Sequence, residues 1–296
     1  MLSKVFAKHY NEKEWLCIKI SIMFLWVLFV LFIVKDYSGQ PYAIGICKLF
    51  DCSIISTTVG RVVFVIANLV LAYCYIRDKY MVATTFLLGV SCLVYFSLQE
   101  SNGIHNRCSL FTFIFFAQSI AYSLHKLGYL QNILKYRIQF SVQAVAASYT
   151  LAALSKLTTS GFGWIADTPN MALQIVKSFS YRYIDYNDIS IFNEGMTYAE
   201  WILDHSILVQ LLLGFSLFLE LFAVLALVNR RTALVYGLLL LGMHIGIAVL
   251  MDIWMMLIAY PMIVYLINPL YLFSTINIKA LPVLSRVKQR ILAVWR

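Results

Sequence analysis

The chain has 296 residues, of which 61% are hydrophobic and only 12% are charged, and its mean hydropathy is +0.80. Soluble globular domains carry about twice this share of charge, so the composition excludes that class together with intrinsic disorder and disulfide-dense secreted scaffolds. The formal net charge of +9 has a meaning only once the basic residues are placed along the chain.

Eight apolar stretches are long enough to cross a bilayer, which takes about 20 residues each. We therefore predict an all-α, polytopic integral membrane protein with about eight transmembrane helices. The first stretch is longer than the apolar part of a signal peptide, and no small-residue cleavage site follows it, so we interpret it as a retained anchor. The predicted spans are 16–34, 60–76, 80–98, 109–125, 138–156, 207–228, 232–251 and 253–273.

The basic residues predict the orientation of these spans. Sixteen of the 23 Lys and Arg precede or enter span 1, follow span 8, or lie in the connections 2–3, 4–5 and 6–7. Short cytoplasmic loops are enriched in Lys and Arg, so both termini are predicted to be cytoplasmic. The positive charge is thus assigned to the inner membrane face and not to nucleic-acid binding.

Three polar features mark the predicted outer face. Cys47 and Cys52 share the first outer loop with the spacing C-x4-C, which in an oxidising exterior predicts a disulfide. The turn between spans 3 and 4 contains His105 and Asn106. The segment 157–206 is acidic and aromatic and is too long for a structureless loop, so we expect it to fold over the membrane surface.

Ionisable residues in or beside the next spans form the candidate site. Lys156 ends span 5, Glu220 lies roughly 20 Å into span 6, and His244 is near the middle of span 7. Such groups are costly in a membrane and usually face a cavity or a partner. Each could also be structural: a lysine that reaches the headgroups, a protonated carboxyl group, or a neutral imidazole bonded to a neighbouring helix.

The carboxyl-terminal segment 279–296 is predicted to be a basic, amphipathic cytoplasmic tail. Leucine, valine, isoleucine and tryptophan recur there at helical spacing between basic residues, from Leu281 to Trp295. This pattern is typical of an interfacial helix on anionic lipid. A solvated basic tail that only enforces topology is an equally good interpretation. Residues 1–278 would then form the transmembrane domain.

The end of span 5 resembles a known family. Tyr149 to Trp164 reads YTLAALSKLTTSGFGW, which resembles the membrane domain of vitamin K-dependent gamma-carboxylase and its bacterial relatives, the HTTM family. Tyr149, Ala152, Lys156 and Leu157 match at the family's spacing, and Trp164 falls a few residues late. Glu220 and His244 resemble an acidic residue and a histidine of the family. The IHNR turn resembles its Asn-His turn, in a register that could place either His105 or Asn106 in line.

This resemblance implies a quinol-linked chemistry. Lys156 would be the base that acts on a reduced quinone, either vitamin K or menaquinol, and His105 or His244 would stabilise the quinol oxygen. Glu220 would orient its neighbours, while Tyr149, Trp164 and Asn106 would contact the quinol. The oxygenated quinol would then remove a proton from a peptide glutamate, so that CO2 could add. No metal is implied.

Three functions follow as hypotheses. The first is carboxylation-like modification of an exported peptide, at a site that faces the extracytoplasmic side. The carboxylase has a large outer domain that this chain lacks, so substrate capture could involve a partner protein. A short HTTM protein that matures a sporulation-delaying toxin of bacilli is a precedent. The second is a non-catalytic scaffold for maturation or export of a peptide toxin, with Lys156 paired to an acid such as Asp204. The third is a transporter with Glu220 and His244 as a proton relay.

Overall fold

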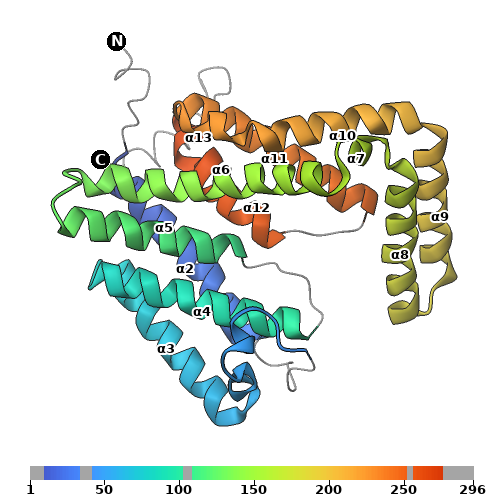
Figure 1. The fold of residues 1–296 in the computed structure, drawn as a ribbon. Coiled ribbons are helices and arrows are strands. Elements are labelled where there is room, and N and C mark those ends of the chain that lie inside the picture. The colour runs from blue at the N-terminus through green and yellow to red at the C-terminus, as the bar shows by residue number, and fades with distance from the viewer. Residues whose placement is uncertain (1–9, 34–41, 103–108, 252–255, 276–296) are drawn as a thin grey trace, which may run out of the picture. The chain divides into compact units, whose positions relative to one another are not determined.

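The computed structural model describes residues 10–33, 42–102, 109–251 and 256–275, and every regular element within these ranges is a helix (Figure 1). The prediction of an all-α protein is confirmed for this part of the chain. The helices are α2 (Glu12–Ile33), η2 (Gly45–Lys48), η3 (Cys52–Ser56), α3 (Thr58–Ile76), α4 (Met81–Ser101), α5 (Ser109–Lys126), α6 (Ile133–Ser160), α7 (Gly163–Ala166), α8 (Thr168–Tyr186), α9 (Ile189–Asp204), α10 (Ser206–Leu221), η4 (Ala223–Leu227), α11 (Arg230–Met251), α12 (Met256–Met262), the π-helical η5 (Ile263–Ile267) and α13 (Pro269–Thr275).

Fewer helices than the eight predicted have the length and apolar character that a membrane span needs. Within the described ranges four qualify: Glu12–Leu31, Thr58–Ile76, Met81–Ser101 and Arg230–Met251. A fifth is added if α9 and α10, which are bent by 89° at their junction, count as one broken span. The residues that the structure describes therefore include four or five helices that could cross a membrane by length and composition.

The missing spans have local causes. α5 and α6 cover the predicted spans 109–125 and 138–156, but α5 contains Gln118 and α6 contains Gln139 and Gln143 within these spans, which lower their apolar character. The last predicted span is divided at Asn268, whose φ is +47°, and the following Pro269 starts a new helix. Proline disfavours helical geometry in the residue before it, so the break at Asn268 follows from the sequence.

The chain forms two compact units, and the division falls within α6. Unit 1 comprises residues 1–145 and 260–296, and unit 2 comprises residues 146–259. In unit 1, Trp15, Trp26, Tyr75 and Tyr95 are buried and meet edge to face. The ring centroids of Trp15 and Tyr75, and of Trp26 and Tyr95, are both 5.9 Å apart. Edge-to-face geometry adds to the stabilisation that burial of these large rings provides.

Buried amide side chains join the helices of unit 1. Gln118 on α5 accepts a hydrogen bond from the Tyr75 hydroxyl on α3 at 2.8 Å. Its amide nitrogen donates to Ser141 on α6 and to the Tyr265 hydroxyl on η5, both at 2.9 Å. One side chain therefore connects four elements. In an apolar interior such a network specifies how the helices pack, because each polar group needs its partner.

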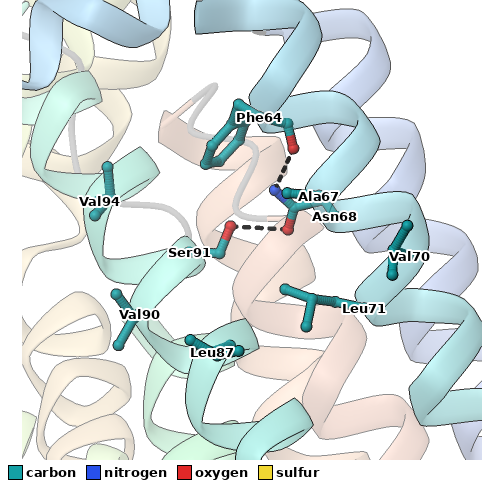
Figure 2. Close-up of a pocket in the computed structure, with 9 residues that line it drawn as sticks. All are labelled: Phe64, Ala67, Asn68, Val70, Leu71, Leu87, Val90, Ser91 and Val94. Carbon is teal, nitrogen blue, oxygen red and sulfur yellow. Dashed lines mark hydrogen bonds between the residues drawn. The ribbon is translucent and has the colours of Figure 1, made fainter.

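A second amide, Asn68, lies at the groove between α3 and α4. Figure 2 shows Asn68 bonded to Ser91 across the groove and to the Phe64 carbonyl on its own helix, at 2.8 and 2.9 Å. The Trp26 indole also donates to Asn68 at 2.9 Å. The groove has a volume of about 510 Å³ and no titratable residue lines it. It is an apolar surface and supplies no acid–base group.

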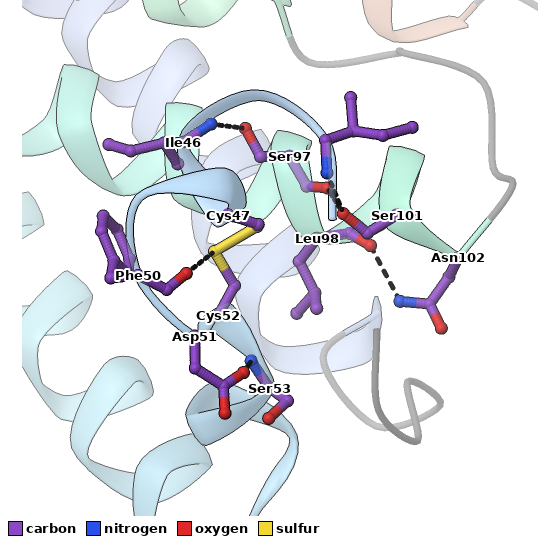
Figure 3. Close-up of a disulfide and its surroundings, with 11 residues drawn as sticks. Ile46, Cys47, Phe50, Asp51, Cys52, Ser53, Ser97, Leu98, Ser101 and Asn102 are labelled. Atoms are coloured by element: carbon purple, nitrogen blue, oxygen red, sulfur yellow. Dashed lines mark hydrogen bonds between the residues drawn. A yellow bond between two sulfur atoms is a disulfide. The ribbon is translucent and has the colours of Figure 1, made fainter. Parts of the chain in front are cut away.

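Cys47 and Cys52 form a disulfide that closes a short loop before α3 (Figure 3). Both cysteines are buried. The loop is held against α4 by hydrogen bonds from the Ile44 and Ile46 amides to Ser101 and Ser97, at 3.1 and 3.2 Å. The disulfide therefore stabilises a loop that polar contacts also attach to α4.

In unit 2 the segment 157–206, which we expected to fold, is helical. α8 and α9 form an antiparallel hairpin with a small core of its own, built around Ile175, Phe179 and Ile202. A Cβ at Gly195 would lie 2.4 Å from the Cβ of Phe179, so only glycine allows this close approach of the two helices. Asp188 caps α9 by accepting hydrogen bonds from the Ser190 amide and hydroxyl.

Candidate functional site

The polar side chains singled out in spans 5 to 7 meet in unit 2. The ammonium Nζ of Lys156 on α6 lies 2.5 Å from Oε2 of Glu220 on α10. The Glu220 side chain is 8% exposed and that of Lys156 is 27% exposed. The carboxylate is therefore enclosed, whereas the amine can still be reached from one side.

Trp164 covers another side of this lysine. It lies on the short helix α7, which follows the end of α6, and its ring centroid is 4.6 Å from Lys156 Nζ. A cation over an indole face is stabilised electrostatically. The same ring is a flat, apolar wall beside the amine.

A second polar pair joins the same helix, α6, to α11. The Tyr149 hydroxyl on α6 is 2.7 Å from Nε2 of His244 on α11, and both side chains are buried. Tyr149 and Lys156 are seven residues apart, so they share one face of α6 at a separation of about 10 Å along the axis. The face of α6 that carries Lys156 thus also carries the tyrosine–histidine pair.

His244 has a nitrogen that these contacts leave unsatisfied. Nδ1 is buried and has no hydrogen-bond partner among the described residues. A buried imidazole nitrogen without a partner carries a desolvation cost of about 1–3 kcal/mol. A ligand with a hydroxyl or carbonyl group would remove that cost, so the orphaned nitrogen indicates a place for one.

The partner of Lys156 is different from the acid proposed for a scaffold. Glu220 lies in the last turn of α10, fourteen residues after Ser206 and about 21 Å along the helix axis. Asp204 lies beyond the other end of α10, at the 89° corner with α9. The length of α10 therefore separates Asp204 from Glu220 and its lysine.

Two of the candidate residues, His105 and Asn106, lie outside the described residues. The other five, Tyr149, Lys156, Trp164, Glu220 and His244, come together in unit 2 as two pairs and one ring. Within the described residues no group of three or more His, Cys, Asp or Glu side chains could hold a metal ion.

The sequence interpretation missed the polar residues of unit 1. Gln118 and Asn68 each lie within a predicted apolar span, and a buried amide at membrane depth is a signal for interhelical hydrogen bonds. Lys19 and Arg137 entered the sequence argument only as markers of orientation. In the structure both are buried and bind Asp78.

The described part of the chain is helical and includes helices that could cross a membrane, and unit 2 holds the Lys156–Glu220 and Tyr149–His244 pairs. Comparisons with models of protein families, with curated proteins and with solved structures found no match for this chain.

Proposed function

We propose that this chain is an integral membrane enzyme of HTTM type that modifies an exported peptide in a quinol-linked reaction. The eight-span arrangement, with both termini cytoplasmic and the site facing outward, belongs to this proposal. The observation that carries it is the Lys156–Glu220 pair, at 2.5 Å, on the face of α6 that also carries the Tyr149–His244 pair.

The residues present fit a reduced quinone. Such a ligand combines a flat ring, which matches the indole of Trp164, with hydroxyl groups, which match Lys156 Nζ and the unpartnered Nδ1 of His244. Its hydrocarbon tail suits the apolar helices around the site. When bound, the quinol would supply the reducing equivalents for reaction with oxygen.

In this proposal one proton passes from the Lys156 ammonium to the Glu220 carboxylate. A lysine acts as a base only without its proton, and Glu220 is close enough to take that proton directly. The Lys156 amine then accepts a proton from a ligand hydroxyl, and its new positive charge faces the oxygen that lost the proton.

The Tyr149–His244 pair positions the ligand. Tyr149 occupies Nε2, which fixes the orientation of the imidazole and directs Nδ1 to a second partner. Trp164 excludes water from one side of Lys156. Lys156 is the catalytic base in this account, and Glu220, Tyr149 and His244 hold the proton and the ligand in place.

The test is the conversion of quinol to its epoxide by the purified chain in lipid, with reduced vitamin K and reduced menaquinone in separate assays under oxygen. We expect turnover by the natural protein and a loss of at least about 100-fold in Lys156→Ala. Lys177→Ala, which removes an exposed lysine from α8, is the matched control and should keep the natural rate. No epoxide from the natural protein with either quinol would overturn the proposal.

One observation favours the scaffold as the second candidate. The contact between Lys156 and Glu220 is as close as a purely structural ion pair would make it. A scaffold would leave all quinol assays without product, and Lys156→Ala would then lower stability without any activity to lose. The same experiment separates the two candidates. The proton-relay transporter remains a hypothesis from the sequence.

A further inference from the structure

Unit 1 gathers most of its described basic residues at one end. The start of α2, the α3–α4 turn and the α5–α6 turn lie together there, because Arg137 on α6 binds both Glu12 on α2 and Asp78 in the α3–α4 turn (Figure 1). We call this end the basic rim. Its charged residues are Glu12, Lys13, Glu14, Lys19, Arg77, Asp78, Lys79, Lys126, Lys135 and Arg137.

The acidic residues of the rim are already engaged by the protein. Asp78 binds the buried ammonium of Lys19, and Arg137 lies 3.6 Å from its second oxygen. Glu12 is 2.7 Å from the Arg137 guanidinium. Glu14 accepts a hydrogen bond from the Asn11 amide in a capping box at the start of α2.

The remaining cations have no such counter-charge. Lys13, Arg77, Lys79, Lys126 and Lys135 form no ion pair with any residue that the structure describes. Arg77, Lys79 and Lys126 are exposed. Seven basic and three acidic residues leave the rim with a net charge of +4, concentrated on side chains at the surface.

Large apolar side chains project beside these cations. Tyr80, next to Lys79, is 82% exposed, and Leu127 and Tyr129, just after Lys126, are 70% and 76% exposed. Exposed tyrosine and leucine next to lysine and arginine are typical of a segment at the boundary between hydrocarbon and headgroups. A soluble anion would use the charges alone, whereas a phospholipid uses both the charges and the apolar side chains.

We propose that the basic rim binds the phosphate headgroups of anionic phospholipids, with Arg77, Lys79, Lys126 and Lys135 as the contacts. This function is separate from the acid–base site of unit 2 and does not depend on it. Juxtamembrane lysines and arginines each attract an anionic surface by about 1 kcal/mol, so several together discriminate clearly between lipids.

The experiment measures lipid binding to the purified full chain by native mass spectrometry, with phosphatidylglycerol and phosphatidylcholine as the probes. We expect a preference for phosphatidylglycerol that falls as ionic strength rises. The double variant Arg77→Gln/Lys79→Gln should bind phosphatidylglycerol roughly thirtyfold more weakly. The matched control Lys48→Gln/Lys177→Gln removes two positive charges elsewhere and should bind as the natural protein does.

Three results would overturn the proposal. The natural protein could bind both lipids equally, or the rim variant and the control could lose affinity to the same extent. Glycerol phosphate, which carries the headgroup charge without acyl chains, could displace the lipid, and the rim would then be a site for soluble anions. The salt dependence of the natural protein is measured without any substitution, so a variant that fails to fold does not prevent the test.

Discussion

Two lysine–carboxylate pairs, one in each unit, differ in which of the two partners is exposed. Lys19 in unit 1 binds Asp78, donates to the Ile76 carbonyl at 2.9 Å, and has a side chain that is 3% exposed. Lys156 in unit 2 has Glu220 as its ion-pair partner and a side chain that is 27% exposed. In the first pair the lysine is buried and the aspartate is exposed to solvent. In the second pair the glutamate is buried and the lysine is partly exposed.

Under the proposed function, this difference in exposure gives Lys19 a structural role and Lys156 a role in proton transfer. The buried ammonium of Lys19, with a carboxylate and a carbonyl as its acceptors, connects α2 to the end of α3. An accessible amine beside an enclosed carboxyl group can exchange a proton with a ligand. The proposed function assigns catalysis to Lys156 because its nitrogen is the accessible one of the two.

Among these predictions, we expect the largest effect on quinol turnover from replacing Glu220, the acid that pairs with Lys156. Glu220→Gln keeps the size of the side chain but cannot take the proton from Lys156, so quinol turnover should fall by about 100-fold. Glu200→Gln, at an exposed position on α9, is the control. Unchanged turnover in Glu220→Gln would show that the lysine loses its proton by another route.

The tyrosine–histidine pair should affect binding more than chemistry. Tyr149→Phe removes the partner of His244 Nε2 and frees the ring to turn, so the KM for the quinol should rise about tenfold while kcat changes little. Steady-state kinetics in lipid measure both quantities. A fall in kcat at constant KM would instead place Tyr149 in the proton transfer.

In unit 1 the amide network should govern stability alone. Gln118→Leu leaves the hydroxyls of Tyr75 and Tyr265 without their amide partner, and we expect a loss of about 1–3 kcal/mol in the free energy of unfolding. Turnover per folded molecule should not change. Thermal unfolding and an activity assay check the two parts, with Gln131→Leu in the exposed α5–α6 turn as the control.

The Cys47–Cys52 disulfide allows a test of the side of the membrane on which its loop lies. Replacing Cys47 and Cys52 together by serine should destabilise the protein by about 2 kcal/mol, the loop-closure value for so short a loop. After reduction, a membrane-impermeant thiol reagent should label the pair from outside intact cells. Labelling only after the membrane is opened would contradict the outward assignment of this loop.

The smallest effect concerns the cap of α9. Hydrogen bonds from Ser190 hold the pKa of Asp188 below its ordinary value, so the cap contributes to stability above that value and is lost as the pH falls through the lowered pKa. Hydrogen exchange at the first turn of α9 should accelerate at acidic pH. Asp188→Ala should show the faster exchange at neutral pH as well.

The sequence predicted the helical class and the members of the candidate site better than their contacts. Lys156, Glu220 and His244 stand out because ionisable groups are costly in apolar helices. The pairing itself depends on the register between α6, α10 and α11, and no spacing within one helix contains that information. The sequence argument named Asp204 as an example of an acid that could pair with Lys156, whereas the structure pairs this lysine with Glu220, at the opposite end of α10.

The span count shows where hydropathy has limited power. A window of apolar residues hides the end of α10 at Leu221, within the predicted span 207–228, and the break at Asn268, because both depend on backbone geometry. Gln118 and Asn68 were visible in the sequence as polar residues within apolar spans. Their role required the structure, since an amide that joins several helices cannot be assigned before its partners are known.

The most direct test compares the two lysines in one assay. Lys156→Gln and Lys19→Gln are prepared in the same lipid, and the quinol turnover per folded molecule and the thermal stability are measured for both. We predict that Lys156→Gln loses turnover and keeps most of its stability, whereas Lys19→Gln loses roughly 1–3 kcal/mol of stability and keeps its turnover. Equal turnover in the two variants would contradict the assignment of Lys156 as the catalytic base.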